Sequence, residues 1–184
     1  MELISSIVFI TGSLALAYIS RASLLHPRSH GFSRFIAWEA ILAGVLYNLK
    51  DWFRDALSWH QLISWLLLII SLYLLIHSLV LLKRAGRQDA RRKDAQLLEF
   101  EKTTALVTTG IYHYIRHPMY SSLLFLAWGV FFKSPSWVDG LIVTVPTLAL
   151  LATARTEEAE DVSFFGEAYR EYMQRSKRFI PYIF

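Results

Sequence analysis

The stretch from Gln61 to Leu82 contains no Asp, Glu, Lys or Arg, and it constrains the fold more than any other feature. About 20 apolar residues are enough for a helix to cross the hydrocarbon core of a bilayer. In addition, 54% of the 184 residues are hydrophobic, which is more than a soluble domain of this size can bury. Four further apolar runs lie at 3–20, 35–49, 120–132 and 137–154. The sequence therefore predicts an all-α bundle of five transmembrane helices that forms a single membrane domain over residues 1–184.

The last two apolar runs are separated by Lys133-Ser-Pro-Ser136, whose residues favour a turn. We therefore expect a helical hairpin at about 120–154. Glu39 interrupts the second run, so its side chain is expected to face a polar cavity or the interior of the bundle. The chain from Arg155 onward has a helix-forming composition with several aromatic residues, which predicts an amphipathic C-terminal helix on the cytoplasmic face.

The charged residues indicate the orientation in the membrane. Three Arg lie in 21–34, eight Lys or Arg in 83–116 and five from Arg155 onward, whereas the alternate loops hold few. Because positive residues mark the cytoplasmic side, the N-terminus is expected outside and the C-terminus in the cytoplasm, in a bacterial inner membrane. The net charge of +4 is small and lies in loops, which argues against nucleic-acid binding. The chain has no Cys, so disulfides, thiolate metal sites and a Cys nucleophile are excluded.

Two polar constellations border the hairpin. Gly110–Tyr120 precedes its first arm and is rich in tyrosine, histidine and arginine, and Arg155-Thr-Glu-Glu158 follows its second arm. Both should therefore lie at the same cytoplasmic edge of the membrane. Polar groups near hydrocarbon are costly unless they are bound, so this edge is a functional-site hypothesis. Taken singly, Arg116 also fits an interfacial anchor, His117 a helix cap and Glu157 a solvated helix face.

The blocks Leu106–Tyr120, Glu157-Glu158, Phe165–Tyr172 and Arg178–Pro181 occur in this order around the hairpin. Together they resemble the isoprenylcysteine carboxyl methyltransferase family and its bacterial relatives, which are also related to phospholipid methyltransferases. The resemblance covers about 104–181, the expected cofactor-binding part. It implies an integral membrane enzyme that binds S-adenosylmethionine in a pocket open to the cytoplasm. The methyl acceptor would be a lipid or lipid-like molecule that enters from the bilayer.

The resemblance also implies roles for single residues. Two positions depart from the family pattern, because Thr104 stands where the family often has His, and Thr153 where characterised members have an Arg that holds the substrate carboxylate. The nearest arginine, Arg155, is displaced by about 200° around a helix. The expected catalytic residues are Arg116, Arg155 and Glu158. The expected cofactor-binding residues are Thr104, Ala105, Leu106, Val107, Tyr112, His117, Pro118, Met119, Tyr120 and Glu157, and no metal is expected.

The chemistry of the residues agrees with such a cofactor. The rings of Tyr112 and Tyr120 offer faces for a cation or a base, His117 and Arg116 suit a carboxylate, and Glu157 suits an ammonium or ribose hydroxyls. The sequence does not determine which atom of the acceptor is methylated. O-methylation of an isoprenylcysteine-like carboxylate needs no base, whereas a phospholipid amine must first lose a proton.

Two other classes are weighed beside the methyltransferase. Membrane sterol reductases that use NADPH have a similar Arg-His block, although they typically carry Asn where this chain has Met119. A non-enzymatic membrane scaffold would tolerate alanine at His117 and Glu157. The sequence leaves the oligomeric state open.

Overall fold

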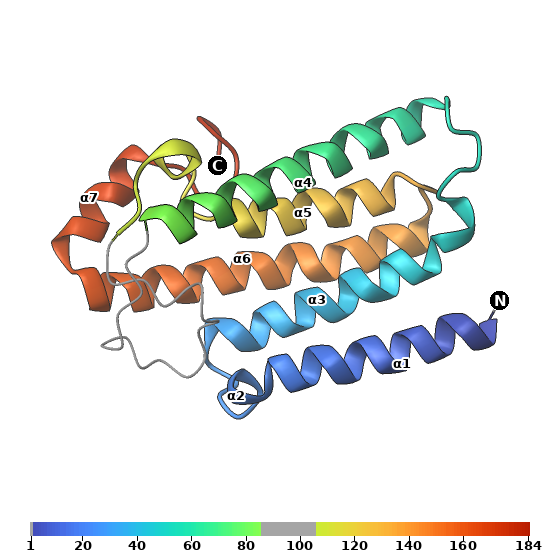
Figure 1. Ribbon diagram of the computed structural model, residues 1–184, viewed down its shortest axis with the longest axis horizontal. Helices are drawn as coiled ribbons and strands as arrows, with labels where there is room; N and C mark the ends of the chain where they lie inside the picture. The colour runs from blue at the N-terminus through green and yellow to red at the C-terminus, as the bar shows by residue number, and fades with distance from the viewer. Residues whose placement is uncertain (1, 86–105) are drawn as a thin grey trace.

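The computed structural model describes residues 2–85 and 106–184, and Figure 1 shows its helices. Regular secondary structure in these two stretches is helical, apart from one isolated parallel bridge between Ile115 and Lys177. The predicted all-α class is therefore confirmed for the described residues. The helices are α1 (Glu2–Ile19), α2 (Arg21–Leu24), α3 (His30–Tyr47), α4 (Trp59–Ala85), α5 (Pro118–Phe131), α6 (Trp137–Phe165) and α7 (Glu167–Arg175), with 3₁₀ turns η1 (Leu49–Asp51) and η3 (Gly110–His113).

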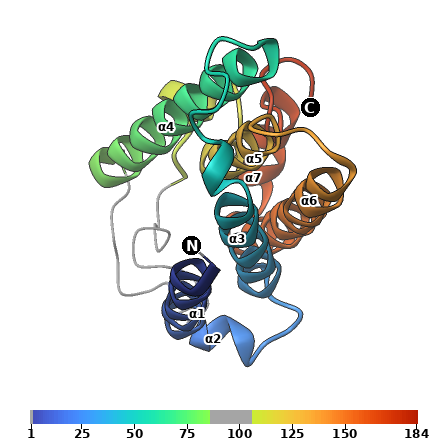
Figure 2. The same ribbon diagram turned by 90° about the vertical axis from the view of Figure 1, so that its right-hand side faces the viewer.

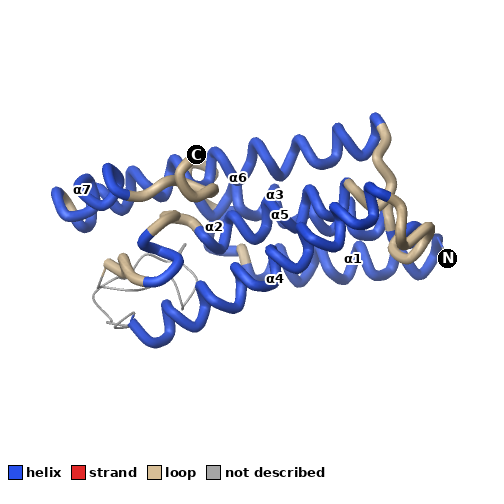
Figure 3. Tube along the Cα trace, turned by 90° about the horizontal axis from the view of Figure 1, so that it is seen from above, coloured by secondary structure: helices blue, strands red, loops and turns tan. Residues whose placement is uncertain are grey.

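The long helices lie side by side. The most extensive contacts join α3 to α6 and α4 to α5, and α5 also meets α6 and α3, so these four helices form the body of the bundle. Figure 2 looks along them and shows α4 beside α5, and α1 outside the four, beside α3. Figures 1 and 3 place α7 and the C-terminal tail at the end of the bundle far from the N-terminus.

Each predicted apolar run corresponds to a helix, but the helices differ in how well they suit a bilayer. Trp59–Arg84 and Trp137–Phe165 are long and apolar enough to cross a membrane, with mean hydropathies of 2.5 and 1.6. Leu3–Ile19 and Pro118–Phe131 are shorter apolar helices. Glu39 lies in α3, and its carboxylate accepts a hydrogen bond from the Ser13 hydroxyl of α1 at 2.6 Å. The Glu39 side chain is therefore turned toward another helix of the bundle. Five transmembrane crossings remain a prediction.

The second arm of the hairpin is longer than predicted. The sequence predicted its end near Ala154, yet α6 continues to Phe165. The chain has neither Gly nor Pro between Pro146 and Gly166, so nothing in this stretch breaks the helix. Gly166 ends it with φ +62°, a conformation that favours glycine. The amphipathic helix expected in this region is the shorter α7, which buries Tyr169 and Tyr172.

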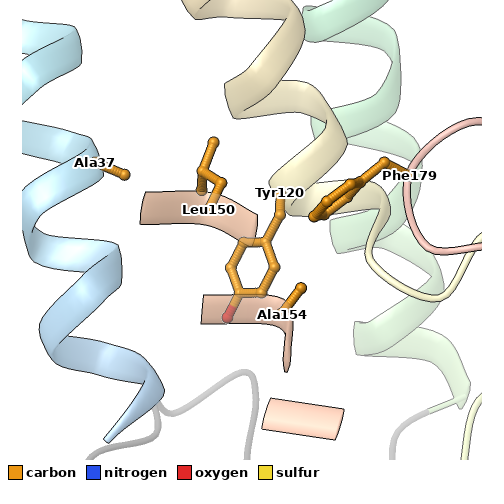
Figure 4. Packing of buried hydrophobic residues seen from close by; sticks show 5 residues of the cluster. All are labelled: Ala37, Tyr120, Leu150, Ala154 and Phe179. Carbon is orange, nitrogen blue, oxygen red and sulfur yellow. The ribbon is translucent and has the colours of Figure 1, made fainter. Parts of the chain in front are cut away.

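A hydrophobic cluster lies where the polar end of the bundle begins. Its members are Ala37, Tyr120, Leu150, Ala154 and Phe179, and Figure 4 shows Tyr120 among the others. Ala37 and Ala154 are wholly buried, and their small side chains let α3 and α6 approach closely. This hydrophobic cluster borders the two polar constellations.

A buried polar network joins the helices at the opposite end. The Lys133 ammonium donates to the Gln61 side chain at 3.1 Å and lies 3.4 Å from the centre of the Trp65 ring. Nearby, the Asn48 amide donates to Asp139 at 2.7 Å. Because each cation or amide is matched by a carbonyl, carboxylate or ring face, the network fixes the hairpin turn against α3 and α4.

Candidate functional site

The segment between η3 and α5 carries Arg116 and His117, and the C-terminal tail fixes it in place. The Arg116 amide donates to the Lys177 carbonyl at 2.8 Å, and the His117 amide donates to the Arg178 carbonyl at 3.2 Å. In return, the Lys177 amide donates to the Tyr114 carbonyl at 2.9 Å. The tail and the first constellation therefore form one rigid unit before α5 begins at Pro118.

Gly110 makes the turn that leads into this unit. Its φ is +61°, and a Cβ atom at this position would lie 2.6 Å from Leu81 Cδ1 of α4. This backbone conformation favours glycine, and a larger residue would also have to displace the end of the Leu81 side chain. The preceding residue, Thr109, has an extended backbone with φ −105° and ψ 164°, and residues 106–108 carry no regular secondary structure.

Glu158 is the centre of a buried ion-pair network. Its carboxylate accepts from Arg116 Nε at 2.9 Å and from Arg178 Nε and Nη2 at 3.1 and 2.6 Å. Arg116 also donates to the carbonyls of Met173 and Ser176. The side chains of Arg116 and Glu158 are only 8% and 6% exposed, so neither is an interfacial anchor or a solvated residue. The network joins α6, the segment before α5 and the tail.

His117 and Glu157 form the second buried pair. His117 Nδ1 lies 3.5 Å from Glu157 Oε2, and His117 Nε2 lies 3.4 Å from Glu158 Oε1. The imidazole also stacks on the Tyr120 ring, with 5.5 Å between ring centres. Burial lowers the pKa of His117, but its interactions with Glu157 and Glu158 outweigh this and raise the pKa to about 9. At neutral pH the ring is therefore a buried imidazolium.

Two polar atoms of this pair are buried without a hydrogen bond to any described residue. They are Glu157 Oε2 and His117 Nε2, whose contacts at 3.4–3.5 Å are long for hydrogen bonds. Buried polar atoms in folded proteins are nearly always hydrogen-bonded, so each exception calls for an explanation. Here the unfilled atoms are a carboxylate oxygen and an imidazole nitrogen that share one site, which suits a ligand with both donor and acceptor groups.

The other predicted residues fall into three groups. Val107, Tyr112, Pro118 and Tyr120 are buried, and the Tyr112 carbonyl accepts from the Tyr172 hydroxyl at 2.6 Å. Leu106 and Met119 are partly buried near them, and Thr104 and Ala105 lie outside the described residues. Arg155 is exposed on α6 and makes no ion pair or hydrogen bond within the described part of the chain, so the structure does not bring it into the Glu158 network.

Two residues of this end were not selected from the sequence. Arg178 belongs to the tail block Arg178–Pro181, but its bond to Glu158 joins residues 20 apart, and no local pattern reveals it. His30 begins α3 and is wholly buried, with Nδ1 2.6 Å from Glu160 Oε2. The sequence signal for His30 was only a histidine in a basic loop.

Comparisons with known proteins identify relatives of this chain. A profile of the family described as phospholipid methyltransferase matches residues 59–169. The chain is 36% identical over 83 residues to protein-S-isoprenylcysteine O-methyltransferase of Schizosaccharomyces pombe, which covers 45% of this chain and 35% of that protein. The human protein of the same name is 28% identical over 167 residues, or 86% of this chain and 57% of the relative.

A methanethiol S-methyltransferase of a Pseudomonas species is also similar, with 25% identity over 149 residues, or 80% of this chain and 54% of that protein. The chain thus spans from about a third to a little over half of the length of these relatives.

Proposed function

This chain belongs to the phospholipid methyltransferase family, and we propose that it acts as a membrane methyltransferase that uses S-adenosylmethionine. Members of the family use this cofactor, and the apolar helices fit a membrane protein. The proposal rests on the His117–Glu157 pair, which lies where the two polar constellations meet. Two buried polar atoms of this pair, His117 Nε2 and Glu157 Oε2, have no hydrogen bond to a described residue.

The residues at this end fit the cofactor. Glu157 would accept from its ammonium or ribose hydroxyls, and the His117 imidazolium would donate to its carboxylate. The buried rings of Tyr112 and Tyr120 supply aromatic surface for the adenine or the sulfonium. When bound, S-adenosylmethionine supplies a methyl group activated by its positive sulfur. The role of the chain is then to align the reactants and exclude water.

Arg116 and Glu158 contribute to this role by holding the site together. The side-chain hydrogen bonds of these two residues to other described residues are to each other, to Arg178, to the Met173 carbonyl and to Ser176. A carboxylate that already accepts three guanidinium donors has little capacity left for a ligand. We therefore propose that these two residues position His117, whereas Glu157 contacts the cofactor.

The charge of the site favours an anionic acceptor. Among the described residues, the cations Arg116, His117 and Arg178 are balanced by the anions Glu157, Glu158 and the neighbouring Asp161. S-adenosylmethionine, with its sulfonium, ammonium and carboxylate, adds one positive charge. Because unbalanced buried charge is costly, a carboxylate or thiolate acceptor is favoured over a neutral amine.

Among anionic acceptors, we propose a lipophilic carboxylate similar to that of isoprenylcysteine. A carboxylate is fully ionised at pH 7, whereas a thiol with a pKa near 8.5 must first lose a proton. Methylation of a methanethiol-like thiol and of a phospholipid amine are the alternatives.

Ligand-induced stabilisation and methyl transfer test the proposal. The purified protein is heated with about 1 mM S-adenosylmethionine, S-adenosylhomocysteine or NADPH, because a ligand that binds only the folded state raises the melting temperature. Methyl transfer is then measured with a prenylated cysteine carrying a free carboxylate, with its methyl ester, with methanethiol and with phosphatidylethanolamine vesicles. We expect stabilisation by the first two ligands and turnover of the free carboxylate alone. Stabilisation by NADPH alone would instead identify a reductase.

A further inference from the structure

The first residue of α3 contacts a carboxylate of α6 at the polar end of the bundle. His30 is wholly buried, and its Nδ1 lies 2.6 Å from Glu160 Oε2 although the two residues are 130 positions apart in the chain. The Glu160 side chain is 36% exposed. Because an ionised carboxylate only accepts hydrogen bonds, the proton of this contact belongs to His30 Nδ1.

Glu160 lies one helical turn beyond Glu157, on the same side of α6. Residues three apart on a helix are neighbours, so the pair is adjacent to the carboxylate that carries the unfilled oxygen. The His30 ring is close enough to Glu157 for their charges to interact. His30 is also the first residue of the helix that packs most extensively on α6, which gives the ring little freedom to move.

Glu157, Glu158 and Glu160 lie within four residues near the end of α6, and each contacts basic side chains from other parts of the chain. Glu158 is met by Arg116 and Arg178, Glu157 by His117, and Glu160 by His30. Three neighbouring carboxylates repel one another, so their arrangement depends on these partners. Among these basic partners, His30 is the one that comes from the N-terminal half of the chain.

We propose that His30, held by Glu160, is a positioning residue of the cofactor site that acts through Glu157. This inference rests on the proposed function. By holding Glu160, His30 fixes the turn of α6 that carries Glu157, so that the Glu157 oxygen without a hydrogen bond stays in place for a ligand. The N-terminal helices then complete the site rather than only anchoring it, although the resemblance that identified the site begins near residue 104.

A double-mutant cycle separates this role from a merely structural one. S-adenosylhomocysteine binding is measured by calorimetry for the full chain in detergent, with wild type, His30→Gln, Glu157→Gln and the double variant. If His30 acts through Glu157, His30→Gln weakens binding about tenfold in wild type, as the loss of a supporting partner typically does, and less than about twofold once Glu157 is gone. A structural role would give the same fold-change in both backgrounds.

The controls are matched to the same region. His26→Gln changes an exposed histidine whose ring bonds only the Ala22 carbonyl among the described residues, and it should leave binding unchanged. If His30→Gln does not fold, Glu160→Gln removes the partner from a partly exposed position and should show the same dependence on Glu157. Equal fold-changes in both backgrounds, or unchanged binding in His30→Gln, would overturn the inference while leaving the methyltransferase proposal intact. Wild-type protein that fails to bind S-adenosylhomocysteine would overturn both.

Discussion

Raising the pH through the titration of His117 should destabilise the folded protein by a predictable amount. The pKa of His117 is raised from an ordinary 6.5 to about 9, and its side chain is only 5% exposed. One pKa unit corresponds to about 1.4 kcal/mol, so the shift contributes about 3 kcal/mol to stability. Because the pKa is raised on folding, this contribution is fully present below pH 6.5 and is lost as the pH rises through about 9.

The melting temperature in detergent, recorded at pH 6.5 and at pH 9.5, measures this loss. For a chain of this size, 1 kcal/mol corresponds to about 2–4 °C, so His117 should account for a fall of about 6–12 °C. His117→Gln is the control, because it cannot titrate in this range although it keeps a polar group beside Glu157. We expect the variant to melt lower than wild type at pH 6.5 and to show a smaller fall. Equal falls in the two proteins would refute the assignment of a buried imidazolium.

Three further predictions concern residues around this site. Glu158→Gln should destabilise the fold by about 3–5 kcal/mol in chemical denaturation, because it leaves the buried Arg116 and the partly buried Arg178 without their counter-charge. Gly110→Ala should cost at least about 1–2 kcal/mol in the same assay, since φ is +61° and the new methyl group would meet Leu81. Arg155→Ala should leave both cofactor binding and turnover near wild type, because Arg155 is exposed and outside the Glu158 network; a large loss of turnover with an acidic acceptor would restore it as the substrate arginine.

The helices were predictable because local signals determine them. Uncharged runs predicted where α4 and α5 lie, and Pro118 and Gly166 mark where helices begin and end. The end of α6 was misplaced because hydropathy falls at Arg155 while helix propensity does not. A membrane boundary and a helix end are different events, and only the second needs a residue that breaks the helix.

The site was predictable where the hairpin brings its two ends together, as for Arg116 with Glu158 and His117 with Glu157. It was not predictable where the partner arrives from elsewhere. Arg178 reaches Glu158 only because the tail folds back along the segment before α5, and His30 reaches Glu160 only because α3 packs on α6. In both cases the pairing depends on tertiary packing, which leaves no periodic pattern in the sequence.

The contrast between Glu157 and Glu158 shows how one helix gives two adjacent carboxylates different tasks. Successive residues on an α-helix point about 100° apart, so the two side chains face different surroundings. Glu158 is directed at Arg116 and Arg178, and its accepting capacity is largely filled. Glu157 faces His117 and keeps a buried oxygen without a hydrogen bond to any described residue. Glu158 therefore joins α6 to the tail, whereas under the proposed function Glu157 is the carboxylate that binds the cofactor.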